Sequence, residues 1–254
     1  MKKEKKKYYS AVKDYSTIKR PHICFQILKF FVKIFFPKNE LIWKTTKWES
    51  GEPVFLVSNH TKIYAPVYFI LNKKEIDARL WTNSFFFFPK ECWHHMWENV
   101  LKYRHPRYLL GFIALLIIPI ICAVFRAING IPVFHKSEKV ETITFKKSME
   151  TFDEGVPQLV FPEKVKPQVN EYLFEFKTGY TVIAEKYYKQ TGKKVKFYPV
   201  YCAQSLRKIV IGEPIEYNPN IQMDEQRYII KEYLQNKIKE LADGLGPHKP
   251  VLYG

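Results

Sequence analysis

The chain has 254 residues, of which 46% are hydrophobic and 17% aromatic, while only 10 are glycine. This composition excludes intrinsic disorder, a collagen-like fibre and a disulfide-stabilised mini-protein, and it suits one domain of generous size with attachments. The formal net charge of +16 implies an anionic partner, and nucleic acid and an anionic membrane surface are the two candidates. The four cysteines (Cys24, Cys92, Cys122 and Cys202) have no CxxC spacing, so we expect reduced thiols in a reducing compartment and no metal site.

The chain begins with a basic segment followed by an apolar one. Residues 1–20 contain eight basic and two acidic side chains without an apolar period, so we expect a mobile arm. Residues 21–38 are rich in Phe and Ile, and Lys29 and Lys33 would share one helical face. The segment is too short and too charged to span a bilayer comfortably, and it lacks the cleavage site of a secretory signal. We predict an interfacial membrane helix, with an amphipathic helix that covers the core as the alternative.

A second apolar run, residues 109–125, contains no charged side chain over 17 residues. As a helix it would reach roughly 26 Å, just short of a hydrocarbon core of about 30 Å. Basic residues flank the run on both sides, so the charges give no orientation. A membrane span, a re-entrant element bent at Pro119 and a buried core helix all fit this pattern.

Residues 39–254 alternate apolar runs with segments of helical spacing. Buried strands are expected at 54–58, 158–161, 195–202 and 208–211, and helices at 139–152, 178–190 and 224–241. This alternation predicts an α/β fold, a mostly parallel sheet covered by helices. We expect a single α/β domain here, with residues 109–125 as a hydrophobic insert that dips into the membrane.

Polar residues follow the first predicted strand, where α/β folds place their sites. The chain leaves strand 54–58 through Ser58, Asn59 and His60. The unperturbed pKa of histidine is about 6.5, so His60 is a candidate general base.

Two further patterns supply basic groups. Gly130 opens a tight turn that leads through Ile131–Phe134 to His135 and Lys136. The strand at 158–161 is followed by Pro162, Glu163 and two lysines, Lys164 and Lys166. Lysines at the end of a strand suit a phosphate group as point charges, and a solvated turn is the alternative.

Together and in this order, the patterns resemble the glycerol-3-phosphate and lysophosphatidic acid acyltransferase family over roughly residues 40–215. The family has four ordered blocks, and their counterparts here are Ser58-Asn59-His60, Gly130-Ile131-Pro132-Val133, Phe161-Pro162-Glu163 and Tyr198-Pro199-Val200. The family's Lys-Gly step before the last block has a counterpart in Phe176–Gly179. The chain departs from the family in three places: Ala65 stands where the family has an Asp, Lys164 where it has Gly, and Lys166 where it has Arg.

The resemblance implies a membrane-associated enzyme of phospholipid synthesis, with its active site on the cytoplasmic side. It would transfer a fatty acyl group from coenzyme A or acyl carrier protein to a hydroxyl of glycerol phosphate or a lysophospholipid, which yields phosphatidic acid or a related lipid. His60 would be the catalytic base. The substrate-binding residues would be Glu163, Lys166, His135, Lys136 and Gly130. Neither a metal nor a cofactor besides the acyl donor is implied.

The resemblance also constrains the apolar run, because one crossing would separate His60 from Gly130. The run must therefore enter and return, lie in one leaflet, or pack on the sheet, and Pro119 favours a bent re-entrant element. The sequence leaves open which group replaces the missing Asp; Asn59, Tyr64, Asp77 and a backbone carbonyl are the candidates.

Two other classes of function stay open. A catalytically inactive relative that binds lipid would explain Ala65. A nucleic-acid-binding protein is supported only by the net charge, since the sequence has no recognisable nucleic-acid module and its basic residues lie beside apolar segments.

Overall fold

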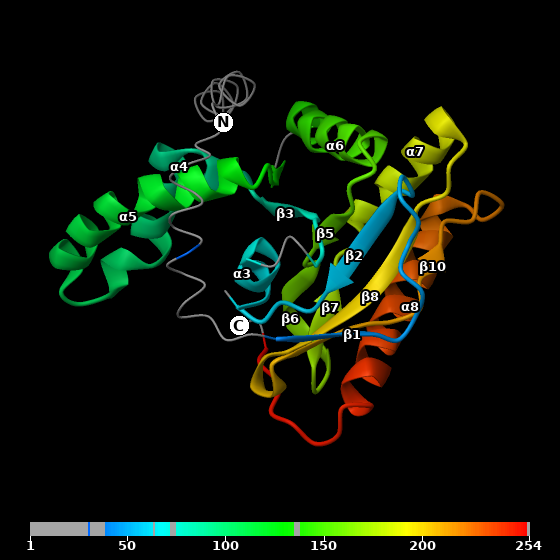
Figure 1. Cartoon of the computed structure of the whole chain (residues 1–254). Coiled ribbons are helices and arrows are strands. Elements are labelled where there is room, and N and C mark those ends of the chain that lie inside the picture. The colour runs from blue at the N-terminus through cyan, green and yellow to red at the C-terminus, as the bar shows by residue number, and fades with distance from the viewer. Residues whose placement is uncertain (1–29, 31–38, 63, 72–74, 135–137, 253–254) are drawn as a thin grey trace. The chain divides into compact units, whose positions relative to one another are not determined.

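The structure is a computed structural model, and it describes residues 30, 39–62, 64–71, 75–134 and 138–252 (Figure 1). The arm predicted at 1–20 lies outside these residues, as does the helix predicted at 21–38 except for Phe30. The chain forms two compact units. The larger comprises residues 33–80 and 147–254, and the smaller comprises residues 81–146 together with 1–32. We describe each unit by itself.

The larger unit is built on a mostly parallel sheet. Its strand order is β1 (Glu40–Trp43), β9 (Lys208–Ile211), β8 (Lys196–Ala203), β2 (Val54–Ser58) and β5 (Gln158–Val160), with the first two residues of β3 (Arg79–Asn83) beside β5. β2 is parallel to β5 and β8, and β1 is parallel to β9. β8 pairs antiparallel with β9 and with β10 (Ile215–Glu216). This sheet, with its helices, confirms the predicted α/β fold class.

The core of the larger unit forms around β2. All five residues of β2 are buried, which explains why its sequence is continuously apolar instead of alternating. The Phe55 ring packs against Phe152, Tyr180 and Phe197 at centroid distances of 5.1, 5.7 and 5.5 Å. The helices of this unit are α3 (Tyr64–Leu71), the second half of α6 (Glu138–Asp153), α7 (Val182–Thr191) and α8 (Met223–Asp243). Helix α8 packs along β8 and fully buries Ile230, Leu234 and Ile238, three positions of its predicted apolar face.

A two-stranded antiparallel hairpin follows β5 at the position of the third sequence block. It consists of β6 (Glu163–Asn170) and β7 (Leu173–Phe176). Short 3₁₀ helices follow at η3 (Gly179–Thr181) and η4 (Gln204–Leu206). The polar sequence of β6, with Pro167 inside it, gives no strand signal, because most of its residues are exposed.

The smaller unit contains the long apolar helix. The last three residues of β3 pair in parallel with β4 (Ile131–Val133). Between them lie η1 (Ser84–Phe87), α4 (Pro89–Asn99), η2 (Leu101–Tyr103) and α5 (Arg107–Ala127). Helix α5 is continuous through Pro119, so the chain turns between α4 and α5 and not at the proline as the sequence suggested.

Helix α5 is the one helix in the described part of the chain that is long and apolar enough to cross a membrane. Among the described residues, only 17% of the most apolar 18-residue stretch of this helix is buried, which argues against a buried core helix.

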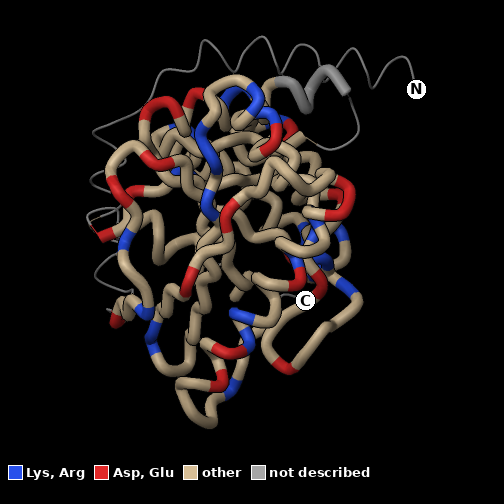
Figure 2. Tube along the Cα trace, turned by 90° about the vertical axis from the view of Figure 1, so that its right-hand side faces the viewer, with Lys and Arg blue, Asp and Glu red and all other residues tan. Residues whose placement is uncertain are grey.

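The positive charge is unevenly distributed along the chain. Residues 1–38 carry +9 of the net +16. In the described residues, Lys and Arg alternate with Asp and Glu along the trace (Figure 2).

Candidate functional site

The turn that carries His60 is fixed to strand β8. Ser58, the last residue of β2, pairs with Val200. Buried Asn59 then continues the pairing with its side chain: Oδ1 accepts the main-chain N–H of Cys202 at 2.8 Å, and Nδ2 donates to the Cys202 carbonyl at 3.3 Å. The side-chain amide of Asn59 thus makes the two hydrogen bonds that the main chain of one further strand residue would make. These bonds fix the position of the main chain just before His60.

His60 is held from a second side by Glu163. The main-chain N–H of His60 donates to Glu163 Oε1 at 2.8 Å, and the imidazole lies edge-on to the Phe161 ring at 5.1 Å. Its Nδ1 atom is buried. Burial lowers the pKa of His60 to about 4, which keeps the imidazole neutral at pH 7 and able to accept a proton.

Glu163 is the first residue of β6 and is only 6% exposed. Its second oxygen, Oε2, accepts the main-chain N–H of Phe174 in β7 at 3.2 Å. Burial raises the pKa of Glu163 to about 7, and the two main-chain N–H groups oppose this rise. Glu163, expected as a substrate-binding residue, therefore contacts main-chain groups and joins the His60 turn to the β6–β7 hairpin.

Ala65, at the position where the resemblance leads us to expect an Asp, is a fully buried residue. Ala65 is the second residue of α3, and its N–H donates to Thr61 Oγ1 at 3.0 Å. The Thr61 hydroxyl thus satisfies one of the free N–H groups at the start of the helix. Of the side chains considered as replacements for Asp, Asn59 bonds the Cys202 main chain, the Tyr64 hydroxyl bonds Asn39, and Asp77 is exposed.

The two lysines of β6 differ in their surroundings: Lys166 is exposed, and Lys164 is in an ion pair. Lys166 is the fourth residue of β6 and is exposed. Lys164 instead forms an ion pair with Glu175 at 2.8 Å, and Lys231 of α8 shares the same carboxylate at 3.0 Å. At the base of the hairpin, the Lys177 N–H donates to the Pro162 carbonyl at 2.8 Å, which ties the Lys-Gly step to the third block.

Three of the four sequence blocks therefore meet in the larger unit. The first block lies beside the fourth through the register of β2 and β8, where Ser58 pairs with Val200. The third joins the first through the Glu163–His60 hydrogen bond. Gly130 is buried directly before β4 in the smaller unit. His135 and Lys136 lie outside the described residues, so the roles of these three residues stay predictions.

Sequence reasoning missed the partners that hold the site. It gave no role to Phe174 or Cys202, which contribute only main-chain groups to these contacts, nor to Thr61, whose hydroxyl accepts a main-chain N–H four residues further on. The one available signal was Asn59, a polar side chain directly after a buried strand. Burial raises the pKa of the Cys202 thiol to about 12, so this cysteine is not a nucleophile.

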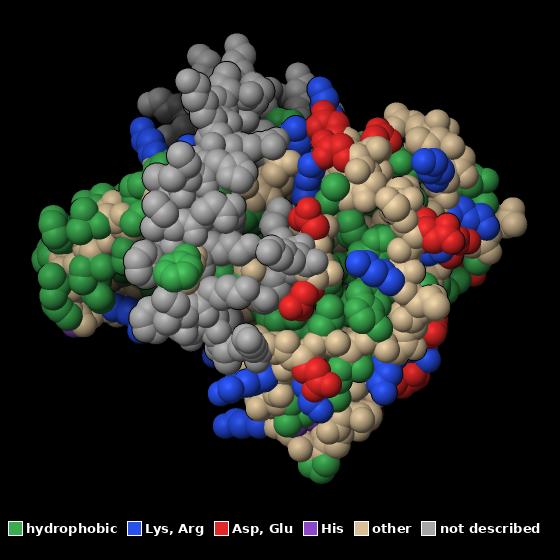
Figure 3. Space-filling view, in the orientation of Figure 1, with side chains coloured by type: hydrophobic (Ala, Val, Ile, Leu, Met, Phe, Trp, Pro, Cys, Tyr) green, Lys and Arg blue, Asp and Glu red, His purple; other side chains and the backbone are tan. Residues whose placement is uncertain are grey.

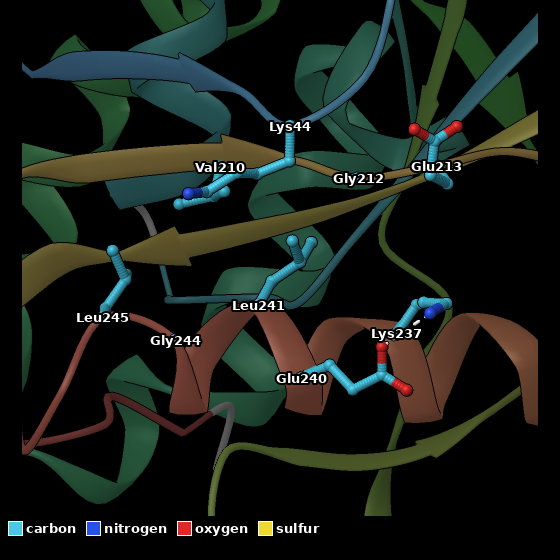
Figure 4. Close-up of a pocket in the computed structure, with 9 residues that line it drawn as sticks. All are labelled: Lys44, Val210, Gly212, Glu213, Lys237, Glu240, Leu241, Gly244 and Leu245. Atoms are coloured by element: carbon cyan, nitrogen blue, oxygen red, sulfur yellow. Dashed lines mark hydrogen bonds and ion pairs between the residues drawn. The ribbon is translucent and has the colours of Figure 1, made fainter.

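A cavity of about 270 Å³ lies elsewhere in the larger unit, between the end of β9 and α8 (Figure 4). It is lined by Lys44, Val210, Gly212, Glu213, Lys237, Glu240, Leu241, Gly244 and Leu245. Lys237 and Glu240 neutralise each other at 2.6 Å, and no lining residue belongs to the four blocks. We therefore place the candidate site at His60 and not in this cavity. Among the described residues, no group of three or more His, Cys, Asp or Glu side chains is arranged to hold a metal ion.

No protein-family model and no curated protein sequence matches the chain. Among solved structures, the chain is similar to the crystal structure of the 1-acyl-sn-glycerophosphate (LPA) acyltransferase, PlsC, from Thermotoga maritima. The two are 14% identical with a TM-score of 0.49, and the match covers 86% of this chain and 79% of the other. The functional argument that follows rests on the residues of this chain.

Proposed function

We propose that the chain is an O-acyltransferase that transfers a fatty acyl group from a thioester to a hydroxyl of a lysophospholipid or glycerol phosphate. The observation that carries the proposal is the 2.8 Å hydrogen bond from the His60 N–H to Glu163. It joins the first block to the third, beside the strand of the fourth, as the resemblance to this acyltransferase family requires.

In the proposed reaction, the neutral His60 imidazole accepts the proton of the acceptor hydroxyl as that oxygen attacks the thioester carbonyl. The tetrahedral intermediate then expels the thiolate, which takes the proton back from the imidazolium. One ester bond forms, one thioester bond breaks, and the thiol leaves. Burial disfavours the imidazolium, so an anionic group next to the ring would raise the pKa of His60. A bound acceptor phosphate would have this effect, which favours phosphate-bearing acceptors.

We assign Lys166 as the cation that meets such a phosphate, as the resemblance implies. It is exposed on the hairpin whose first residue, Glu163, holds the His60 turn. A lysine supplies a point charge without the two-pronged contact of an arginine, so we expect looser phosphate binding than in family members with arginine. Gly130, His135 and Lys136 complete the proposed substrate-binding set.

The proposed setting is the cytoplasmic side of a membrane, in phospholipid synthesis. Coenzyme A or acyl carrier protein would deliver the acyl group, and no other cofactor or metal would be needed. The supporting observations are the exposed apolar helix α5 and the three described cysteines, Cys92, Cys122 and Cys202, which are free thiols as expected in a reducing compartment.

A lipid-binding protein without catalytic activity is the second candidate, and Ala65 favours it. The residue is fully buried, so a methyl group occupies the place where a carboxylate would orient the histidine. Loss of the orienting carboxylate in the serine protease triad lowers kcat about 10⁴-fold.

The discriminating experiment is acyl transfer by the purified full-length chain. Acyl-coenzyme A and acyl-carrier protein would be tested with glycerol 3-phosphate, lysophosphatidic acid and lysophosphatidylcholine, and the new ester identified by mass spectrometry. His60→Ala serves as the blank and His94→Ala, an exposed histidine of α4, as the matched control. Ester formation by the wild type and the control but not the blank supports the enzyme. Equal signals in all three, together with saturable lysolipid binding, support the lipid-binding protein.

A further inference from the structure

We propose that α4 and α5 form a monotopic membrane anchor, in which the outer face of α5 lies in a single leaflet of an anionic bilayer and both ends of the segment emerge on the same side. The inference rests on the proposed membrane location but not on acyl transfer, and its test is read without activity.

The outer face of α5 is a continuous apolar surface. Its exposed residues are Leu109, Phe112, Ile113, Leu115, Leu116, Ile117 and Ile120, each between 41% and 61% exposed. Figure 3 shows hydrophobic side chains gathered over this helix. Large contiguous apolar patches of this kind mark contact with a membrane or another protein.

The inner face of the same helix is already packed. Gly111 lies against the Trp97 and Trp93 rings of α4, and a Cβ at this position would meet Trp97 at 3.1 Å. About two and three turns further along α5, Ile118 and Cys122 pack with Cys92 of α4 in a buried cluster. Among the described residues, the outer face therefore takes no part in the packing of the helix pair.

Helix α4 prevents α5 from crossing the bilayer. Because α4 packs along α5, a transmembrane α5 would carry it into the hydrocarbon region. The helix bears Lys90, Glu91 and Glu98, charges that are costly at that depth. Its 11 residues would also reach only about 16 Å, half of the distance that a second span requires.

Both ends of the segment are tied to one place. The chain leaves β3 and returns into β4, and these two strands pair, with Asn83 opposite Val133. The guanidinium of Arg126 at the end of α5 donates to the Phe87 carbonyl just before α4, at 2.7 Å from Nε. The segment between β3 and β4 therefore cannot cross the bilayer an odd number of times. Since α4 is too short for a second crossing, the segment enters and leaves through one leaflet.

The start of α5 is suited to anionic headgroups. Tyr103 and Tyr108 are each 72% exposed, and the cations of Lys102 and Arg107 lie over their rings at 5.0 and 4.8 Å. Exposed Arg104 lies between them. Tyrosines are enriched at membrane interfaces, and basic side chains there attract anionic lipids. Because of these basic side chains, we assign the apolar face of α5 to an anionic bilayer and not to an apolar protein surface.

A photo-crosslinking amino acid at position 116 tests the occupant in the full-length protein. Vesicles of phosphatidylcholine with 30% phosphatidylglycerol are compared with phosphatidylcholine alone, and position 229, an exposed Ile of α8, is the control. We expect lipid adducts at 116 on the anionic vesicles and none at 229. Adducts with another protein would overturn the proposal. So would a protein that binds anionic vesicles but forms no lipid adduct at 116, because another segment would then hold it on the vesicle.

Neutralising the basic cluster tests the lipid charge. The triple variant Lys102→Gln, Arg104→Gln, Arg107→Gln should lower the lipid-adduct yield at 116 on anionic vesicles by about fivefold per charge and leave the yield on neutral vesicles unchanged. Equal yields of wild type and variant on anionic vesicles would contradict the assignment to anionic lipid.

Labelling from outside tests the topology. In a Cys24→Ser background, His105→Cys, in the turn between α4 and α5, is compared with Tyr228→Cys on α8. With protein bound to the outside of sealed vesicles, a membrane-impermeant maleimide should label both positions equally. Labelling of position 105 only after detergent would show that α5 crosses the bilayer and would overturn the monotopic assignment.

Discussion

Glu163 binds the main-chain N–H of His60 at 2.8 Å, although 103 residues separate the two in the chain. The other oxygen of the same buried carboxyl binds the Phe174 N–H at 3.2 Å. One side chain thereby fixes the turn of the candidate base relative to the hairpin that carries Lys166. We therefore propose that Glu163 is a positioning residue that acts through these two elements.

Glu163→Ala should remove both acceptors and leave two partly buried N–H groups without them. We expect a loss of about 1–3 kcal/mol in the free energy of unfolding for each N–H group left unsatisfied, and a fall of at least tenfold in kcat. Glu163→Gln retains one carbonyl acceptor and should recover part of both quantities. Chemical denaturation and steady-state kinetics measure them; identical stability of the Ala variant and the wild type would contradict the positioning role.

The raised pKa of Glu163 predicts a pH dependence of stability. A carboxyl with a folded-state pKa of about 7 and an ordinary value of 4.5 binds its proton more tightly in the folded protein. Its contribution is fully present below about pH 4.5 and is lost as the pH rises through about 7. Glu163→Gln lacks this loss, so its free energy of unfolding should rise relative to the wild type by up to about 3 kcal/mol between these pH values.

His60 contributes in the opposite direction, because its pKa falls from 6.5 to about 4 in the folded protein. Its contribution is present above pH 6.5 and is lost as the pH falls through 4. The wild-type curve is therefore the sum of two opposed trends, and the difference between the wild type and Glu163→Gln isolates the carboxyl. A difference that stays constant from pH 4.5 to 7.5 would show that Glu163 has an ordinary pKa.

The sequence predicted the parts of the fold that are buried on both sides or on one helical face. The run 54–58 is continuously apolar because β2 is covered on both faces, and the spacing of Ile230, Leu234 and Ile238 repeats every helical turn. The β6–β7 hairpin was not predicted, because its exposed residues carry no apolar alternation.

For the site, the sequence suggested His60, Glu163 and Lys166 but not how they are connected. The Glu163–His60 bond uses a main-chain donor, which any residue could supply, so no side-chain pattern records it. The same holds for the pairing of Asn59 with Cys202. The burial of α3 could not be predicted from the sequence either. The resemblance singled out Ala65 because the family has an Asp there, but its full burial is known only from the structure.

Ala65→Asp should destabilise the protein and should not increase acyl transfer. The new carboxylate would be buried at a fully enclosed position, which costs several kcal/mol unless it is paired or protonated. Ala65→Ser, of nearly the same size and uncharged, is the control. Thermal unfolding and turnover of both variants check the expectation. A gain in transfer by the Asp variant would instead show that the wild-type site lacks only the carboxylate.

Lys166→Ala should weaken the use of phosphate-bearing acceptors with little effect on stability, because the side chain is exposed. We expect KM for lysophosphatidic acid to rise about tenfold, while KM for an acceptor without phosphate stays unchanged. Lys193→Ala, an exposed lysine after α7, is the matched control. Equal effects on both acceptors would remove the phosphate-binding role.

The central claim is that His60 takes the proton of the attacking hydroxyl, and thiol release from an acyl thioester in the presence of lysophosphatidic acid tests it most directly. The wild type and His94→Ala should release thiol in proportion to the ester formed, while His60→Ala should be slower by a factor of about 10²–10⁴, with an unchanged unfolding temperature. If His60→Ala releases thiol at the wild-type rate, or if the wild type is no faster than the variant with every donor and acceptor, His60 is not the catalytic base and the account is wrong.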